Sequence, residues 1–454
     1  MSIIFPTYSE KKALSKSKQK KFCIWQIVTN RERKRMRKLA LSDEILLSVD
    51  KAARYIGGEV NSVMKDKNKV DIRFAMCFPD VYEIGMSNLG MMILYNMFNE
   101  REDVWAERVF SPWLDLDKIM REKEIPLFAL ESQEPVKNFD FLGITLGYEM
   151  CYTNVLQVLD LSHVSLLAKD REEDDPIVIG GGACAYNPEP IAEFFDMFYI
   201  GEGETVYDAL FDAYKANKAA GGSRKDFLFA ASQIPGIYVP SLYNVTYKED
   251  GTIASFTPAR EGVPEKVCKQ LITDITKEYR AIKAPVVPFI KATQDRVTLE
   301  IQRGCIRGCR FCQAGMIYRP TRERDVETLK ASAREMLQNT GHEEISLSSL
   351  SSSDYSELKE LVNFLIEELH GNAVNISLPS LRIDAFALDV MSKVQDVKKS
   401  SLTFAPEAGS QRLRNVINKG LTEEDILHGA GEAFKGGWNQ VKLYFMLGLP
   451  TETE

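Results

Sequence analysis

Three cysteines, Cys305, Cys309 and Cys312, lie close together in the stretch EIQRGCIRGCRFCQAGMIYRP, residues 300–320. A disulfide would use two of these thiols and leave the third unpaired. A structural zinc ion prefers four ligands in a closed tetrahedron, and the nearest histidine in the sequence, His342, belongs to another segment. Three thiolates on one loop suit an iron–sulfur cluster with one iron open to a further ligand. We therefore expect a cluster at this loop, with zinc as the alternative.

The elements that would position this loop follow a strand–helix rhythm over residues 296–454. Five apolar stretches predict strands: RVTLEIQRGC, EEISLSSL, VNISLPSLRID, SSLTFAPEAG and QVKLYFMLGLP. Helical patterns such as DVETLKASAREMLQ separate them, which predicts a parallel barrel or an open sheet with its chemistry at the carboxyl ends of the strands. The sequence stops just after the fifth strand, so we expect a partial barrel and treat the sequence as a possible fragment.

Residues 70–215 repeat the same pattern of buried strand, glycine or polar turn, and helix. The pattern predicts a Rossmann-like, doubly wound parallel sheet, whose ligands lie outside the carboxyl ends of its strands. Glycines follow two of these strands, in PIVIGGGACAYNPEP and in YIGEGE. Glycine lets the backbone approach a ligand closely or adopt positive φ, although a simple turn explains each motif as well.

The remaining segments predict a domain order. Residues 1–35 form a basic leader that we expect to be disordered or a misassigned start, because residues 1–38 hold twelve Lys and Arg against two Glu. Residues 36–69 predict a helical segment with Ser42 as N-cap. Residues 216–295 predict a linker with a short hairpin at Glu249-Asp250-Gly251.

Composition limits the classes of protein. The chain has 454 residues, 44% hydrophobic and 27% charged, and no apolar run of the ~20 residues that span a bilayer. These values predict a globular, cytoplasmic protein without a membrane partner. A reducing compartment disfavours disulfides, so Cys77, Cys151, Cys184 and Cys268 are most simply buried hydrophobic residues. The acidic body argues against broad polyanion binding, so nucleic acid is not indicated, although a local basic groove stays possible in principle.

The motif RGCIRGCRFCQAG resembles the CxxxCxxC signature of radical S-adenosylmethionine (SAM) enzymes, with the aromatic residue Phe311 before the last cysteine. The resemblance implies a [4Fe-4S] cluster on Cys305, Cys309 and Cys312, whose open iron binds SAM. It implies reductive cleavage of SAM to a 5'-deoxyadenosyl radical, and an electron donor such as flavodoxin or ferredoxin. The SAM contacts that it implies, at the cluster motif and at the ends of later strands, are Phe311, Ser349, Ser351, Glu407 and Gly448.

The N-terminal half resembles the cobalamin-binding domain that precedes the catalytic domain in one group of radical SAM enzymes. The matching loop, DVYEIG, contains Asp80, Tyr82 and Gly85, with Tyr82 where cobalt-ligating domains have His. A phenol is a poor substitute for imidazole as a cobalt ligand at neutral pH. Either cobalamin binds without a protein ligand to cobalt, or the domain has lost the cofactor. The other residues that the resemblance assigns to cobalamin are Gly180, Gly181, Gly182, Gly201, Glu202 and Gly203.

Two alternative functions stay open at this stage. A methylthiotransferase would carry a second cluster on the N-terminal domain, for which Cys77, Cys151 and Cys184 are the available cysteines. A non-catalytic iron–sulfur redox sensor would use a cluster without cleaving SAM. The substrate is not readable: methyl transfer is expected if cobalamin binds, and hydrogen abstraction leading to rearrangement if it does not.

Overall fold

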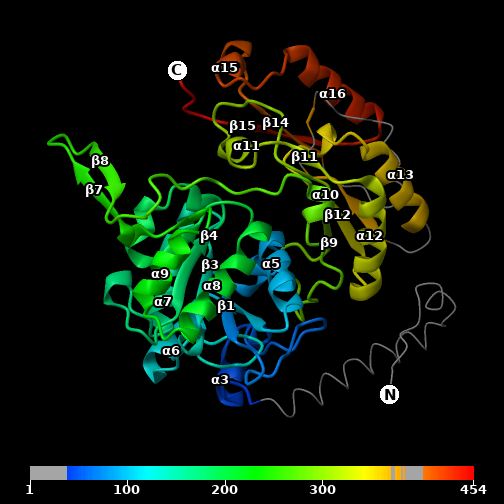
Figure 1. Ribbon diagram of the computed structural model, residues 1–454. Helices are drawn as coiled ribbons and strands as arrows, with labels where there is room; N and C mark the ends of the chain where they lie inside the picture. The colour runs from blue at the N-terminus through cyan, green and yellow to red at the C-terminus, as the bar shows by residue number, and fades with distance from the viewer. Residues whose placement is uncertain (1–37, 370–373, 380–381, 384–401, 454) are drawn as a thin grey trace, which may run out of the picture. The chain divides into compact units, whose positions relative to one another are not determined.

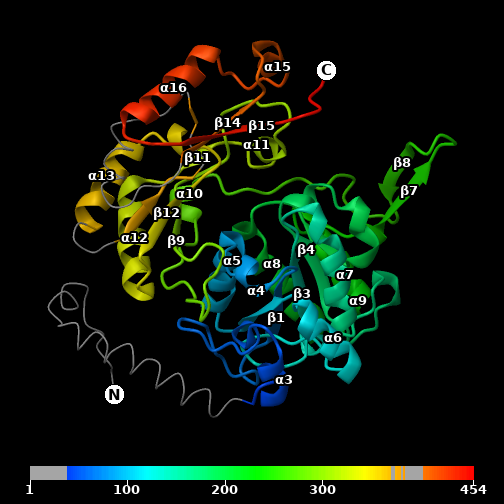
Figure 2. The ribbon, with the colours of Figure 1, turned by 180° about the vertical axis from the view of Figure 1, so that it is seen from behind.

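A computed structural model describes residues 38–369, 374–379, 382–383 and 402–453 (Figures 1 and 2). The basic leader predicted at residues 1–35 lies outside these ranges. The chain divides into two compact units: Met1–Leu271 with Ala284–Gln294, and Ile272–Lys283 with Asp295–Glu454. No helix among the described residues combines the length and apolar character needed to cross a membrane.

Unit one is built on a six-stranded sheet of order β2-β1-β3-β4-β5-β6. Its strands are β1 (Ile72–Phe78), β2 (Val104–Phe110), β3 (Phe141–Thr145), β4 (Ile177–Gly181), β5 (Met197–Tyr199) and β6 (Ile237–Tyr238). β1 to β5 are mutually parallel, and β6 pairs antiparallel with β5. Because β1, β3, β4 and β5 run in one direction, the loops that follow them meet at one edge of the sheet.

Helices cover both faces of this sheet, as the alternation of side chains along each strand requires. On one face, Phe74 and Phe141 pack against aromatic residues of α5 (Leu89–Glu100), α8 (Tyr207–Ala219) and α9 (Arg224–Ser232). On the other face, the neighbouring residues Ala75 and Leu142 share an apolar core with α3 (Asp43–Ser48), α6 (Leu114–Lys123) and α7 (Tyr152–Leu161). The prediction of a doubly wound α/β domain is confirmed.

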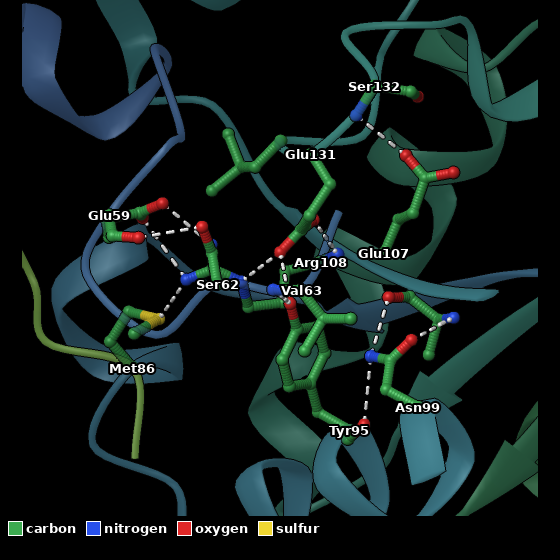
Figure 3. Close-up of polar contacts among 12 residues, drawn as sticks. Glu59, Ser62, Val63, Met86, Tyr95, Asn99, Glu107, Arg108, Glu131 and Ser132 are labelled. Carbon is green, nitrogen blue, oxygen red and sulfur yellow. Dashed lines mark hydrogen bonds and ion pairs between the residues drawn. The ribbon is translucent and has the colours of Figure 1, made fainter. Parts of the chain in front are cut away.

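A buried charge network ties the segment before β1 to this sheet (Figure 3). Arg108 of β2 lies between Glu59 and Glu131, with N–O distances of 2.7 and 2.6 Å, and all three side chains are fully buried. Tyr82 and Tyr95 donate to these two carboxylates, at 2.8 and 2.9 Å. Buried charges are tolerated only when paired and hydrogen-bonded, so these five side chains depend on one another.

The end of unit one differs from the predicted domain order. Residues 216–295 were expected to be a linker, whereas α9 and β6 belong to the layers of unit one. The reason is that Tyr238 of β6 is buried beside Phe198 of β5, a contact that the local sequence does not reveal. The predicted hairpin is confirmed: β7 (Tyr243–Tyr247) pairs antiparallel with β8 (Ile253–Pro258) around Gly251.

Unit two repeats strand and helix. β9 (Val297–Glu300), β12 (Glu344–Ser348) and β13 (Asn375–Ser377) form a parallel sheet of order β13-β12-β9, and β14 (Leu402–Glu407) pairs in parallel with β15 (Val441–Phe445). The prediction of five strands is therefore confirmed. The remaining elements are α10 (Ile275–Glu278), β10 (Gln302–Arg303), α11 (Gln313–Ile317), β11 (Arg322–Glu323), α12 (Val326–Thr340), α13 (Leu358–Leu369), α15 (Gln411–Val416) and α16 (Glu423–Lys435).

The helices of unit two flank strands whose residues alternate in character. In β12, the buried apolar residues Ile345 and Leu347 alternate with the polar residues Glu344, Ser346 and Ser348, of which Ser346 is also buried. β9 alternates in the same way, and α12 packs against it with an apolar stripe that includes Leu329 and Ala333. The cysteine motif follows β9 and β10, at the carboxyl end of the β13-β12-β9 sheet.

Candidate functional site

The cysteine loop begins directly after β10, at Gly304. Gly304 has φ +88°, and a Cβ on it would lie 2.6 Å from the carbonyl oxygen of Tyr318 and 2.7 Å from that of Pro320. Only glycine fits this close approach of backbone to backbone. The loop ends at Cys312, which is the N-cap of α11. The chain therefore holds the three cysteines between a tight turn and a short helix.

The thiols of this loop are partly accessible, and two of them lie beside backbone N–H donors. Cys305, Cys309 and Cys312 are half-buried and form no disulfide. The backbone N–H of Arg307 donates to Cys305 Sγ at 3.4 Å, and that of Gly315 donates to Cys312 Sγ at 3.3 Å. N–H···S hydrogen bonds to cysteine ligands are one way in which proteins tune iron–sulfur clusters. Three free thiols, two of them with such donors, are the donor set that a [4Fe-4S] cluster requires.

The loop after β12 contacts the cysteine loop through Asp354. Arg307 binds this carboxylate with Nε and Nη2, at 3.0 and 2.5 Å, and Ser351 Oγ donates to it at 2.7 Å. Burial raises the pKa of Asp354, but the hydrogen bonds from Arg307 and Ser351 outweigh burial and hold the pKa below its usual range. One ionised carboxylate thus joins the cysteine loop to the serine-rich segment.

The predicted SAM residues Ser349 and Ser351 both lie in that segment. Ser351 is 1% exposed, and its backbone N–H donates to Ser349 Oγ at 3.1 Å. Ser349 Oγ also lies 3.1 Å from Ser352 Oγ, and Ser352 Oγ donates to the Pro379 carbonyl oxygen at 2.7 Å. The serine run is therefore a hydrogen-bonded turn that links the ends of β12 and β13.

The end of α15 lies against the other side of the cysteine loop. The Arg310 backbone N–H donates to the Ile417 carbonyl oxygen at 2.9 Å. Asn418 donates from Nδ2 to the Gly308 carbonyl oxygen at 2.8 Å, and its own φ is +53°. A non-glycine residue at positive φ costs energy and often marks a functional site. These contacts hold residues 308–310 from the far side of the loop.

Glu407 ends β14 near the aromatic residue of the motif. Its φ is +67°, and Lys419 Nζ lies 3.3 Å from Glu407 Oε1 and 5.8 Å from the centre of the Phe311 ring. Lys419 therefore bridges two of the residues that the sequence analysis assigned to SAM. The positive φ of Glu407 is a strained backbone conformation of the kind often found at functional sites, and this indication does not depend on the sequence motif.

The last predicted SAM residue, Gly448, follows β15 with φ +76°. The next residue, Leu449, packs with Ala408, Leu413 and Ile417 in a small apolar cluster on α15. Because Ala408 directly follows Glu407, this cluster keeps the segment after β15 beside the segment after β14. Contacts within unit two thus connect all five predicted SAM residues, directly or through a neighbouring residue, to the surroundings of the cysteine loop.

The predicted cobalamin residues lie at the carboxyl edge of unit one. Asp80 accepts a hydrogen bond from the Tyr148 hydroxyl at 2.6 Å. Tyr82 is 1% exposed, its hydroxyl donates to Glu59, and burial raises its pKa far above the usual range. A Cβ on Gly85 would lie 2.2 Å from the Phe110 ring. Tyr82 and Gly85 are therefore engaged inside the protein, and Asp80 is the most open of the three.

Internal packing accounts for most glycines of the two glycine motifs. Gly182 has φ +108° and lies against the backbone of Leu146, and Gly201 has φ +151° and lies against Gln270. Cβ atoms on Gly180 and Gly203 would lie 2.7 and 2.5 Å from Phe198 and Leu94. A Cβ on Gly181, by contrast, would meet nothing closer than 4.0 Å. Glu202, between Gly201 and Gly203, is also engaged within the protein, because its backbone carbonyl oxygen accepts a hydrogen bond from the Tyr199 hydroxyl at 2.7 Å.

Three of the four cysteines of unit one that were predicted to be buried lie in its core, whereas the fourth, Cys268, is exposed, so that prediction was wrong for Cys268. Cys77, Cys151 and Cys184 belong to the apolar cluster below α6 and α7, and burial raises the pKa of each, that of Cys184 to about 11. Within the described ranges, no three His, Cys, Asp or Glu side chains converge as they would around a bound metal ion, in unit one or at the cysteine loop. Among the cysteines that the structure describes, only Cys305, Cys309 and Cys312 are both partly exposed and close to one another in the sequence.

Three residues of the site were missed by the sequence analysis: Asp354, Asn418 and Lys419. Asp354 was the only acidic residue of the serine-rich run SSLSSSDY, and that was its one signal. Lys419 and Asn418 follow α15 in the sequence VINKG, which contains no feature that connects it to a cysteine loop more than a hundred residues earlier.

Family models match both units. A model described as the radical SAM superfamily matches residues 299–454, and one described as the N-terminal part of radical SAM proteins matches residues 90–240. Among curated relatives, an uncharacterised protein of Methanocaldococcus jannaschii is 32% identical over 383 residues, which are 84% of this chain and 70% of the relative.

Two further relatives carry more specific descriptions. An uncharacterised methyltransferase of Pyrococcus horikoshii is 22% identical over 375 residues, covering 80% of this chain and 70% of its own. A putative methylthiotransferase of M. jannaschii is 25% identical over 210 residues, covering 43% and 46%.

Solved structures share the fold. The radical SAM methyltransferase TsrM of Kitasatospora setae, solved with a tryptophan substrate and a SAM analogue, matches with TM-score 0.50 and 14% identity over 84% of this chain and 68% of that one. The cobalamin-dependent SAM radical enzyme OxsB, solved with aqua-cobalamin, matches with TM-score 0.51 and 15% identity over 82% and 49%. At this identity the likeness concerns the fold alone.

Proposed function

This chain belongs to the radical SAM superfamily, and from that premise we propose that its cysteine loop holds a [4Fe-4S] cluster that cleaves SAM reductively. When bound, such a cluster delivers an electron to SAM and so generates a 5'-deoxyadenosyl radical. The observation that carries the proposal is the loop itself: three free, half-buried thiols with backbone N–H donors on two of them.

The residues around the loop have separate roles in this proposal. Cys305, Cys309 and Cys312 ligate three irons. Ser351 and Ser349 hydrogen-bond the amino group of the methionine moiety, with Asp354 holding Ser351 in place at 2.7 Å. Glu407 accepts from the ribose hydroxyls, and Lys419 orients its carboxylate from 3.3 Å. Phe311 and the backbone at Gly448 contact the rest of the nucleoside.

Cobalamin binding by unit one is the second part of the proposal. Tyr82 does not serve as a cobalt ligand, because its buried hydroxyl is used by Glu59. The support for cobalamin is the shared fold with TsrM and OxsB, whose structures contain it, and the open position of Gly181 and Asp80 at the carboxyl edge. We therefore propose that cobalamin binds there without a protein ligand to cobalt, and that the reaction is a methyl transfer.

A second cluster on unit one, as in a methylthiotransferase, is the alternative. One relative bears that description, but Cys77, Cys151 and Cys184 are buried in an apolar core with pKa values raised by burial. Iron analysis separates the two functions, because one [4Fe-4S] cluster gives about four irons per chain and two clusters give about eight.

The direct test of the proposal is product formation. Anaerobically reconstituted protein is reduced with dithionite in the presence of SAM, and 5'-deoxyadenosine is measured by mass spectrometry. We expect 5'-deoxyadenosine from the wild type and none from Cys309→Ala. Wild-type protein with four irons and intact SAM would point to the redox-sensor alternative. When aquacobalamin is added to the protein, the absorption spectrum of the cobalamin should shift on binding. An unchanged spectrum would contradict the proposal that unit one binds cobalamin.

A further inference from the structure

A small pocket lies beside β2, the strand at one edge of the sheet of unit one. Four of the side chains that line it are polar, Arg54, Tyr55, Tyr82 and Ser111, and the others are apolar and belong to residues 110–130. The volume of the pocket is about 20 Å³, and a cavity needs about 10–15 Å³ to hold one water molecule. The pocket therefore has room for one or two atoms of that size.

Two of the polar side chains that line the pocket are buried and lack hydrogen bonds. Arg54 is 7% exposed and Ser111 is 5% exposed. Within the part of the chain that the structure describes, Arg54 Nη1 and Ser111 Oγ have no hydrogen-bond partner. A buried donor that stays unpaired costs free energy, and the cost is larger for a charged group. Two such groups on one pocket indicate that the pocket takes a ligand.

The other nitrogens of Arg54 are fixed by an ion pair. Nε and Nη2 of Arg54 donate to the two carboxylate oxygens of Glu83, each at 2.9 Å. Lys51 Nζ lies 2.9 Å from the same carboxylate. Glu83 thus faces two cations with one negative charge, so this group of three side chains carries a net positive charge. Nη1 is the nitrogen of Arg54 that is left for a ligand.

The polar groups of the pocket suit an anion better than a water molecule. The Arg54 guanidinium and the Ser111 hydroxyl are donors, and the Tyr55 oxygen already accepts from the Trp113 backbone N–H at 3.1 Å. The Tyr82 hydroxyl donates to Glu59. Among the described residues, no carboxylate or amide side chain lines the pocket. A water molecule also needs acceptors for its own two hydrogens, whereas an anion only accepts.

The nearby acidic residue Asp115 does not neutralise this pocket. It acts electrostatically on the Tyr55 hydroxyl, but it is not among the lining residues. Its two carboxylate oxygens accept from the backbone N–H groups of Asp50 and Leu116, each at 2.7 Å. Leu116 lies in the first turn of α6, where a negative charge is favourable. The charge of Asp115 therefore serves the start of α6.

We propose that this pocket binds one small monovalent anion, of the size of chloride, between Arg54 Nη1 and the Ser111 hydroxyl. Chloride is only slightly larger than a water molecule, whereas phosphate and sulfate exceed a volume of about 20 Å³. The anion pairs both buried donors. Through Arg54 it also stabilises the position of Glu83 in the loop after β1. The inference is independent of the cluster and of cobalamin.

The test compares three proteins as full chains: wild type, Ser111→Ala and the matched control Ser162→Ala. Ser162 is 0% exposed, and in the described part of the chain its hydroxyl also has no hydrogen-bond partner. It does not line the pocket. The two variants therefore remove the same buried group, once inside the pocket and once outside it.

The measurement is urea unfolding at increasing chloride concentration. Sodium gluconate replaces sodium chloride so that the ionic strength stays constant, and gluconate is a monovalent anion too large for the pocket. Unfolding is followed by tryptophan fluorescence. Trp113 contributes to this signal from beside the pocket, since its ring centre lies 5.6 Å from Arg54 Cζ.

We expect the urea midpoint of the wild type to rise as chloride replaces gluconate, because a ligand that binds only the folded state stabilises that state. Ser162→Ala should show the same rise from its own starting midpoint. Ser111→Ala lacks one hydrogen bond to the anion, so it should bind chloride at least about tenfold more weakly. The rise of its midpoint should therefore begin at a correspondingly higher chloride concentration.

A second measurement uses the wild type alone and does not depend on how well the variants fold. Crystals of the full chain are grown in bromide, and the anomalous scattering of bromide locates the anion. We expect an anomalous peak at hydrogen-bond distance from Arg54 Nη1 and Ser111 Oγ.

Either measurement can overturn the inference. The same chloride dependence in Ser111→Ala and in the wild type would mean that chloride acts at another place. A wild-type midpoint that does not respond to chloride would mean that the pocket does not bind it. Density without an anomalous signal at Arg54 and Ser111 in the bromide crystals would show that the ligand is a water molecule.

Discussion

Asp354→Asn tests whether the loop after β12 and the cysteine loop act together in SAM binding. The Asp354 side chain is 7% exposed, and its carboxylate accepts two hydrogen bonds from Arg307 and one from Ser351. Asparagine has nearly the same shape but one acceptor oxygen, and its amide group faces the Arg307 donors. The substitution therefore removes the charge and sets donor against donor while leaving the packing unchanged.

The expected magnitude follows from these contacts. A hydrogen bond to a charged group contributes about 1.5–3 kcal/mol net. Asparagine keeps one acceptor, and Arg307 is one-third exposed, so we expect a loss of roughly 2 kcal/mol. If the loss falls on the SAM-bound state, SAM affinity falls roughly 30-fold.

The assay is a titration of the reduced, cluster-containing protein with SAM, followed by electron paramagnetic resonance. The control is Glu344→Gln, which removes another carboxylate–arginine pair, with Arg296 at 2.5 Å, from the amino-terminal end of the same sheet. We expect Glu344→Gln to bind SAM like wild type and Asp354→Glu to recover part of the affinity. Normal SAM affinity in Asp354→Asn, with thermal stability lowered as in Glu344→Gln, would refute the reasoning and leave Asp354 a purely structural residue.

Three further predictions concern the fold that supports the site. Arg108→Met leaves the buried carboxylates of Glu59 and Glu131 without the cation that neutralises them, so urea unfolding should show a loss of about 3–5 kcal/mol; a loss below about 1 kcal/mol would contradict the network in Figure 3. Burial raises the pKa of Glu107 to about 6, so its contribution to stability is complete below about pH 4.5 and lost as pH rises through 6. Glu107→Gln should therefore remove roughly 2 kcal/mol of pH dependence from the unfolding free energy between pH 4.5 and 7, and an unchanged slope would refute the shift. Gly304→Ala places a Cβ 2.6 Å from the Tyr318 carbonyl oxygen, so the iron content after reconstitution should fall. The control is Gly308→Ala, whose Cβ would meet only the Asn418 side chain, at 3.1 Å, and whose iron content should stay well above that of Gly304→Ala. Equal iron contents in the two variants would mean that the cluster does not need the turn at Gly304.

The sequence analysis identified elements that depend on local patterns. Ser42 caps α3, the hairpin turns at Gly251, and the five strands of unit two lie where apolar stretches stand. The cysteine motif was equally visible, because its three ligands are neighbours in the sequence. Such features arise from residues a few positions apart, and their physics can be read from a short window.

Features that depend on distant pairing were not predictable. Arg108 lies 49 residues from Glu59 and 23 from Glu131 in the sequence, and no local rule pairs them. Asp354 finds Arg307 only because β9 and β12 are neighbours in the sheet. β6 was expected to be linker because two residues are too few for a strand pattern, and pairing with β5 determines its structure.

The glycines show a different limit. The sequence analysis assigned Gly180, Gly182, Gly201 and Gly203 to cobalamin, and that assignment stays a proposal. The structure contains an internal reason for each of them, since a Cβ would approach Phe198, Leu146, Gln270 or Leu94 to within 3 Å. A glycine motif after a strand therefore does not distinguish a ligand from close packing, and Gly181 is the position where a substitution separates the two.

The central claim is that an open iron on the cysteine loop binds SAM. The most direct measurement is the electron paramagnetic resonance spectrum of the reduced, reconstituted chain, recorded with and without SAM, beside Cys309→Ala. The account predicts that SAM changes the cluster signal of the wild type and that this change is absent in the variant. A wild-type cluster signal that is the same with and without SAM would contradict it.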